Sequence, residues 1–352
     1  MNRKHFLSSL LAAGSSLPSF GRVSALHGQP QRGDQKTEPG ASAQIPPYLR
    51  NGDTIGITCP AGWITEAEIQ PAIQQLERWG WAVRVGDTVG KKDFTFGGTD
   101  IERAADLQQM LDDPSLGAIL CARGGYGAVR IVDRLDFSHF ASQPKWIIGF
   151  SDITVLHAHL NRNLRIASVH SKMCNSFPDD WSRGEPDQIT TLLSIRQLLA
   201  GERIDYAVTP DPNNRTGIAE GELIGGNLKT LETLAGTASD ISTDRKILFV
   251  EDTGEYLYSI DRMFWNLERT GKLRGLKGLI VGGFKLKPDD AGEEFGRTLY
   301  DIVLERVRAY DYPVCFGFPV GHQKNNFALK CGALHKLQVS REGVVFEDLS
   351  LI

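Results

Sequence analysis

The chain has 352 residues, of which 41% are hydrophobic and 23% are charged, and its formal net charge is −4. These are ordinary values for a globular protein that is long enough to bury a substantial core and to form two domains. A slightly acidic chain has no general attraction to nucleic acid or to an anionic membrane, so we expect a small-molecule or peptide substrate and no nucleic-acid partner.

The first residues have the features of an export signal. Residues 2–5 are basic, residues 6–20 are apolar but too short to span a membrane, and a small-residue cleavage pattern follows. We therefore expect a signal peptide over 1–25, a disordered tether over 26–44, an exported and periplasmic protein, and no stable membrane insertion after signal removal. Arg3-Lys4 is similar to a relaxed twin-arginine motif, which leaves the export route open between that pathway and Sec.

Strands and helices alternate in the first half of the chain. Apolar, β-branched runs predict strands, and apolar residues at helical spacing predict the helices between them. The expected strands are 53–58, 81–85, 118–121 and 146–150, and the expected helices follow Thr65 and cover 101–111 and 128–135. This alternation predicts an α/β fold with a doubly wound, mostly parallel sheet, in which ligands bind beyond the carboxyl ends of the strands.

The second half changes character and is expected to form a separate domain. We expect an N-terminal α/β domain over 45–178, a polar connection over 179–215 with a helix at 188–199, and a smaller, β-rich C-terminal domain over 216–352. The strands expected in the C-terminal domain are 216–224, 246–251, 279–284, 314–316, 337–339 and 344–348, and its helices are 228–234, 258–270 and 298–307.

Ser151 stands where a fully apolar strand meets a helix. It can be an ordinary N-cap whose hydroxyl accepts a backbone N–H of the first helical turn. It can also be a nucleophile, because a tight turn from strand to helix holds a serine clear of the sheet, next to amides that stabilise an oxyanion. The sequence leaves both readings open, since Gly149 to Asp152 lacks the second glycine of the G-x-S-x-G nucleophile elbow.

A glycine-rich loop, Arg123 to Gly127, follows the strand at 118–121. It matches neither the G-x-G-x-x-G fingerprint nor a P-loop. Glycine lets bare N–H groups approach a ligand closely, so this loop and the amide of Asp152 could together form an oxyanion hole. The alternative is a tight turn that needs glycine for its backbone angles.

A nucleophilic serine needs a base, and the base needs an orienting group. Of the eight histidines, two lie in the signal and tether and three in contexts typical of surface or core residues, which leaves His170, His322 and His335. His322 is the best placed, in a glycine-bordered loop after a strand. Glu251 ends an apolar strand at the ligand edge, where it is either the orienting carboxylate or a solvated turn residue.

The five cysteines form no C-x-x-C pair, and we expect them to be mostly buried thiols. His157 and His159 have H-x-H spacing, but in a helix these positions face different ways. We therefore expect no metal site.

Five short motifs occur in the order and approximate spacing of one peptidase family. They are Arg123 to Gly127, Gly149 to Asp152, Gly225 to Leu228, Val250 to Asp252 and Gly317 to His322. Over roughly Ile45 to Ile352 the chain resembles the LD-carboxypeptidase (muramoyltetrapeptide carboxypeptidase) family, which includes peptidases that confer immunity to microcin C. The ordered set makes the resemblance specific, whereas any one motif alone is weak.

The resemblance implies a metal-free serine peptidase without a cofactor, usually a homodimer, with its site between the two domains. The family's triad maps onto Ser151, Glu251 and His322. Its oxyanion hole maps onto the backbone amides of Asp152 and of Gly124 or Gly125. The candidates for substrate binding are Arg123, Tyr126, Gly226, Asn227 and Arg262, with either arginine as the cation for the substrate carboxylate.

Members of the family release the terminal D-alanine from murein tetrapeptides by cutting an L,D-peptide bond. An export signal fits a peptidoglycan-derived peptide as substrate, although the best-known members act on cytoplasmic recycling intermediates. Two alternatives stay open. One is a microcin C-type or general peptide or amide hydrolase that uses the same triad. The other is an exported, non-catalytic ligand-binding protein.

Overall fold

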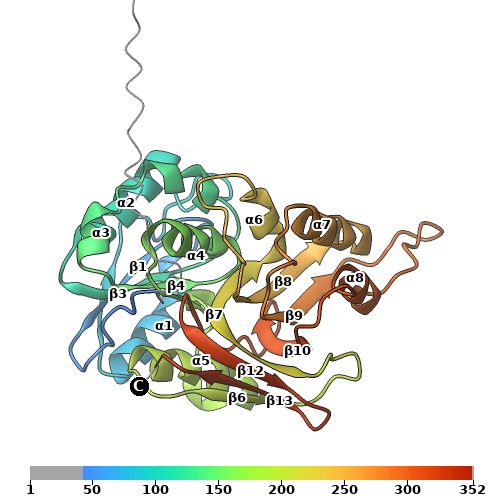
Figure 1. The fold of residues 1–352 in the computed structure, drawn as a ribbon. Coiled ribbons are helices and arrows are strands. Elements are labelled where there is room, and N and C mark those ends of the chain that lie inside the picture. The colour runs from blue at the N-terminus through green and yellow to red at the C-terminus, as the bar shows by residue number, and fades with distance from the viewer. Residues whose placement is uncertain (1–42, 351–352) are drawn as a thin grey trace, which may run out of the picture. The chain divides into compact units, whose positions relative to one another are not determined.

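The computed structural model describes residues 43–350. The predicted signal peptide and all but the last two residues of the predicted tether lie outside these residues. Gln44 already belongs to the folded part, because it forms an isolated bridge with Ile166. Two sheets organise the described residues, and Figure 1 shows the helices packed around them.

The first sheet has six strands in the order β11-β5-β4-β3-β1-β2. All neighbouring strands are parallel except β11 and β5, which are antiparallel. The crossovers return each strand in the same direction, so the carboxyl ends of the parallel strands share one edge. The strands are β1 (Thr54–Thr58), β2 (Ala82–Val85), β3 (Leu116–Cys121), β4 (Trp146–Gly149), β5 (Ser168–His170) and β11 (Leu329–Cys331).

Two helices of the first half begin at a capping box in the sequence. Thr65 and Thr99 each form a capping box with the glutamate three residues later, and α1 and α2 start directly after them. The α-helices are α1 (Glu66–Arg78), α2 (Asp100–Asp112), α3 (Ser138–Ser142), α4 (Thr154–His159) and α5 (Pro186–Leu199). Together with the sheet they confirm the predicted α/β class.

The helix predicted over 128–135 is wrong. The structure has two short 3-10 turns there, Ala128–Arg130 and Val132–Arg134. Val129, Ile131 and Val132 are β-branched, which lowers their α-helix propensity. The first amide, that of Ala128, donates to the side chain of Asp152, so contacts elsewhere in the fold fix this segment.

The second sheet has seven strands in the order β10-β9-β8-β7-β12-β13-β6. Its β7 to β10 part is parallel and its β12, β13 and β6 part is antiparallel. The strands and the three helices predicted for the second half are present, and β6 comes from the predicted connection. The elements are β6 (Asp205–Val208), β7 (Gly217–Asn227), α6 (Leu228–Thr233), β8 (Ile247–Glu255), α7 (Leu257–Arg269), β9 (Gly278–Leu286), α8 (Leu299–Arg306), β10 (Val314–Gly321), β12 (Leu334–Val339) and β13 (Val344–Asp348).

Apolar packing joins the two sheets. One buried cluster contains Phe150, Ile153 and Met173 from the first half together with Leu248 and Phe264 from the second. Helix α4 packs against both α6 and β7. The carboxyl ends of β4 and β8 are therefore held beside each other by a shared core.

The chain also crosses back from the second sheet to the first. After β10 ends at Gly321, the segment 322–328 leads into β11, where Leu329 is paired with His170 of β5. His322 lies in the loop after β10, as predicted. Because β11 pairs with β5, this loop lies near the edge of the first sheet that contains Ser151.

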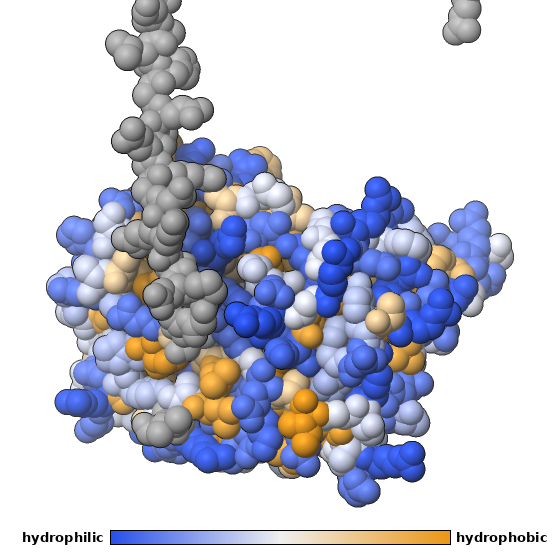
Figure 2. Space-filling view, in the orientation of Figure 1, coloured by the Kyte–Doolittle hydropathy of each residue, from blue (hydrophilic) through white to orange (hydrophobic). Residues whose placement is uncertain are grey.

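The surface and the thiols fit an ordinary globular protein. Figure 2 shows hydrophobic residues in small groups among hydrophilic ones on the face that it displays. Within residues 43–350, no helix is both long and apolar enough to cross a membrane. All five cysteines are buried and free, as predicted for most of them.

Candidate active site

Ser151 occupies a strained turn at the end of β4. Its φ is +63°, a left-handed conformation that is uncommon outside glycine and costs about 1–3 kcal/mol. A 3-10 turn, Ser151–Ile153, follows and runs straight into α4, and no side chain caps the start of this turn. The Ser151 side chain is half-buried, and its hydroxyl has no hydrogen-bond partner among the described residues. The geometry therefore does not support the N-cap reading.

The glycine-rich loop lies directly against this turn. A Cβ atom added to Gly124 would lie 3.0 Å from Cβ of Ser151 and 3.2 Å from the carbonyl oxygen of Phe150, so only glycine fits without displacement. The Gly124 carbonyl accepts a hydrogen bond from the Gly62 amide at 2.8 Å. Within the described part of the chain, the amides of Gly124 and Gly125 donate to no acceptor. The loop thus offers free N–H groups beside the hydroxyl.

Asp152 ties the loop to the turn. Its Oδ2 atom accepts a hydrogen bond from the Ala128 amide at 2.7 Å, just beyond the glycines. The side chain is 7% exposed, and burial raises the pKa of Asp152 to about 6 against the opposing effect of the Ala128 and Gly127 amides and of Arg103. The Asp152 carboxyl therefore has a structural role, and its own amide lies in the first turn after the serine.

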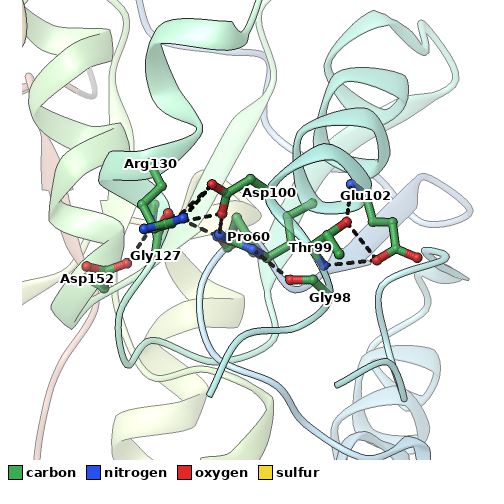
Figure 3. Close-up of polar contacts among 10 residues, drawn as sticks. Pro60, Gly98, Thr99, Asp100, Glu102, Gly127, Arg130 and Asp152 are labelled. Carbon is green, nitrogen blue, oxygen red and sulfur yellow. Dashed lines mark hydrogen bonds and ion pairs between the residues drawn. The ribbon is translucent and has the colours of Figure 1, made fainter. Parts of the chain in front are cut away.

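Behind the loop lies Arg103, a fully buried residue of α2 that the sequence did not single out. Its Nη1 donates to the Gly127 carbonyl at 3.0 Å and also to the Pro60 carbonyl, and its Nη2 donates to Asp100 Oδ1 at 2.6 Å. Figure 3 labels these three partners, Pro60, Asp100 and Gly127. Arg130 also donates to both carboxylate oxygens of Asp100. Arg103 thereby ties the last residue of the loop to Pro60 and to α2.

Replacing Arg103 with methionine should lower the free energy of unfolding by about 3 kcal/mol, because buried carbonyls lose their donor. The matched control is Arg130→Met. Arg130 pairs with the same Asp100, but 46% of its side chain is exposed, and its loss should leave stability nearly unchanged. Urea unfolding of both variants measures the difference. Equal free energies of unfolding for the two variants would show that the buried contacts of Arg103 do not stabilise the loop.

His322 and Glu251 form a close pair. His322 Nδ1 lies 2.6 Å from Glu251 Oε2, and Glu251 is fully buried in β8. A hydrogen bond donated from Nδ1–H to this carboxylate leaves the lone pair of the ring on Nε2. A Cβ atom on Gly321, whose φ is +102°, would overlap the Glu251 side chain. Because Gly321 has no side chain, the backbone before His322 can approach the Glu251 side chain closely.

The imidazole of His322 lies next to the serine turn. Its ring centroid is 5.0 Å from that of Phe150, the residue before Ser151. Among the described residues no hydrogen bond joins the Ser151 hydroxyl to the imidazole. Such bonds are often long without substrate and shorten in the reacting complex. The structure thus pairs His322 with Glu251 and places the imidazole beside Phe150, the residue before Ser151; the triad role of the three residues stays a prediction.

The other two candidate histidines are buried. Burial lowers the pKa of His335 to about 4, and its Nδ1 bonds to the Ala333 carbonyl. Burial also lowers the pKa of His170 well below its usual value, and its Nε2 lies 3.2 Å from Asn326 Oδ1. His322 is the half-exposed member of the three.

The predicted substrate-binding residues occupy different settings. Asn227 is buried, and its side chain caps α6 and donates to Asp252. Its backbone amide donates to the Thr154 hydroxyl, and the backbone of Gly226 also packs against Thr154. Tyr126 is exposed and contacts Phe96. These contacts join the end of β7 to α4. Contact of Asn227 and Gly226 with substrate stays a prediction.

The two candidate arginines are also differently placed. Arg123 is half-buried, and its Nη1 donates to the Trp63 carbonyl at 3.2 Å. Arg262 is exposed on α7, with Cζ 5.3 Å from the ring centroid of Tyr258. Across residues 43–350, no three His, Cys, Asp or Glu side chains are grouped to hold a metal ion.

Comparison with known proteins identifies the family. Residues 55–171 match the LD-carboxypeptidase N-terminal domain and residues 220–337 match the LD-carboxypeptidase C-terminal domain. A probable murein peptide carboxypeptidase of Bacillus subtilis is 33% identical over 86% of this chain and 94% of its own length. The murein tetrapeptide carboxypeptidase of Pseudomonas aeruginosa is 30% identical over 82% of this chain and 94% of its own length.

Solved structures and a more distant relative agree with this match. The crystal structure of a muramoyltetrapeptide carboxypeptidase from Oxalobacter formigenes has a TM-score of 0.73 and 27% identity, covering 84% of this chain and 98% of that one. The microcin self-immunity protein MccF of Escherichia coli is 25% identical over 81% of this chain and 90% of its own length. With its two matched domains and its fold, this chain belongs to the LD-carboxypeptidase family and is a peptide hydrolase.

Proposed function

We propose that this enzyme is a serine carboxypeptidase that cuts the L,D-peptide bond before the terminal D-alanine of murein tetrapeptides. The observation that carries the proposal is the 2.6 Å pair of His322 and Glu251 beside the strained Ser151 turn. A base held by a buried carboxylate, next to a serine at a helix start, is the arrangement that activates a hydroxyl for attack on an acyl group.

In the proposed reaction, His322 Nε2 takes the proton of Ser151 as the hydroxyl oxygen attacks the scissile carbonyl. The amides of Asp152 and of Gly124 or Gly125 stabilise the resulting oxyanion. As the C–N bond breaks, His322 gives the proton to the leaving amine of D-alanine, and an acyl-enzyme stays on Ser151. Water, deprotonated by His322, then releases the shortened peptide. Glu251 stabilises the imidazolium in both steps.

The murein tetrapeptide is favoured as substrate because two relatives, of Pseudomonas aeruginosa at 30% identity and of Oxalobacter formigenes at 27%, are named as carboxypeptidases for this peptide. We also propose, from the predicted signal peptide, that the enzyme is exported to the periplasm and meets peptides released from the wall. The homodimer implied by the family resemblance remains part of this proposal.

A microcin-type hydrolase is the second candidate, and the similarity to MccF favours it. It would use the same triad on a different acyl compound. Membership in a peptidase family supports either enzyme over a non-catalytic binding protein.

The test is incubation of the purified protein with murein tetrapeptide, with free D-alanine followed by mass spectrometry. We expect equal amounts of D-alanine and tripeptide, and no cleavage of the diastereomer that ends in L-alanine. Unchanged tetrapeptide beside a cleaved microcin analogue would reverse the order of the two candidates.

A further inference from the structure

Lys172 follows β5 at the edge of the first sheet that carries the active site. The amide of its neighbour Ser171 donates to the Gly149 carbonyl, two residues before Ser151. The Lys172 ammonium lies 2.7 Å from the Gln323 carbonyl and 5.7 Å from the ring centroid of Phe150. Gln323 follows His322, and Phe150 precedes Ser151. The lysine therefore bonds to the residue after the base and lies over the ring of the residue before the nucleophile.

The charge of Lys172 has no direct counter-ion. The side chain is half-buried, yet among the described residues no carboxylate oxygen lies within 4.0 Å of its Nζ. Burial lowers the pKa of Lys172, and only a longer-range attraction to Glu251 opposes this effect. By contrast, buried Lys246 and Lys330 pair with carboxylates at 2.9 and 2.6 Å. A half-buried cation without such a partner is costly, which favours an anion supplied by a ligand.

Lys172 also has donors to spare. An ammonium has three N–H donors, and only the bond to the Gln323 carbonyl is made within the described part of the chain. Arg262, one of the arginines predicted for this task, stacks on Tyr258 of its own helix instead. Arg123, the first residue of the glycine-rich loop, donates to the Trp63 carbonyl.

We propose that Lys172 binds the terminal carboxylate of the peptide and thereby makes the enzyme an exopeptidase. In a peptide that ends at the leaving residue, this carboxylate is one carbon away from the scissile nitrogen. That nitrogen receives its proton from His322, so the carboxylate must lie near the residues that flank the imidazole. Lys172 is the cation that contacts one of them. The inference rests on the proposed carboxypeptidase function and adds the residue that selects a free C-terminus.

Two matched peptides test the inference: the tetrapeptide acid and the same tetrapeptide with a C-terminal carboxamide. We expect the wild-type enzyme to prefer the acid. Lys172→Met should lower kcat/KM for the acid about 10- to 100-fold, mainly through KM, because a charged hydrogen bond is lost. It should leave kcat/KM for the amide nearly unchanged, so the preference disappears. Lys172→Arg keeps the charge and should restore a large part of the preference.

Controls separate this role from a structural one. Lys324 lies in the same segment as Gln323 but is exposed and paired with Glu185, so Lys324→Met should change neither substrate. Equal losses on acid and amide in Lys172→Met would mean that the lysine only holds the Gln323 segment, which overturns the inference. Loss of the preference in Arg123→Met, with Lys172→Met unaffected, would also overturn it.

Binding to the inactive Ser151→Ala protein gives a second readout that needs no catalysis. Calorimetry should show tighter binding of the acid than of the amide, and the added Lys172→Met change should remove the difference. If the wild-type enzyme cleaves neither peptide but this binding preference is present, the proposed function fails and the role of Lys172 stands. If cleavage occurs and the lysine has no effect on either readout, the function stands and the role of Lys172 fails.

Discussion

Ser151→Ala is expected to lower kcat for release of D-alanine about 10⁴- to 10⁶-fold, the loss typical of a nucleophile that acts with a base as one unit. The loss should appear in kcat, since the side chain supplies chemistry and little ground-state binding. The half-buried hydroxyl has no hydrogen bond to lose within the described structure, so the fold should be unaffected.

Rates of D-alanine release and thermal unfolding of the same samples measure both parts of this prediction. Ser176→Ala, at a half-buried serine outside the site, is the matched control and should keep full activity. Ser151→Gly adds a test of the strained turn. It should be as inactive as the alanine variant but more stable than it by about 1 kcal/mol, because glycine adopts φ of +63° without strain. Activity that survives in both variants would remove Ser151 from the mechanism.

Glu251→Gln is expected to lower kcat about 10³- to 10⁴-fold while leaving the shape of the pocket in place. The change removes the negative charge that stabilises the imidazolium. In addition, Glu251 Oε1 is buried with no partner among the described residues, so an amide nitrogen placed there would have no acceptor. The alternative rotamer points the amide at Nδ1, which moves the histidine proton to Nε2 and blocks proton transfer from the serine.

Asp252→Asn is the matched control for this change. Asp252 is the next residue of β8, is also buried, and binds Asn227 and the Lys229 amide rather than the histidine. Its replacement should change kcat less than about tenfold, because no contact with the reacting atoms is lost. Comparable losses in the two variants would point to a general disturbance of β8 and not to a triad carboxylate.

Local patterns were enough to predict the frame of the site. The apolar run before Ser151, the glycines at 124 and 125, and the strand containing Glu251 lie within single elements, so their placement follows from strand and helix periodicity. Glu251 was predicted to end its strand, but β8 continues to Glu255. The family motifs supplied the pairing of Glu251 with His322, which the structure shows as a direct contact.

Contacts between segments that are far apart in the chain could not be predicted from the sequence. In the sequence, Arg103 cannot be distinguished from other helical residues. Its contact with the Gly127 carbonyl depends on the packing of α2 against the glycine-rich loop. Lys172 and Gln323 are 151 positions apart and meet because β11 pairs with β5. The turns at 128–135 depend in the same way on Asp152, which binds the first amide and overrides the helical pattern.

The central claim is that the Ser151 hydroxyl is made nucleophilic by an imidazole and a carboxylate from the other half of the chain. Reaction of the purified enzyme with a fluorophosphonate probe, followed by mass spectrometry of the labelled peptide, tests this most directly. We predict one covalent label on Ser151, no label in Ser151→Ala, and labelling slowed by orders of magnitude in Glu251→Gln. A label on another residue, or an unlabelled enzyme that still releases D-alanine, would contradict the claim.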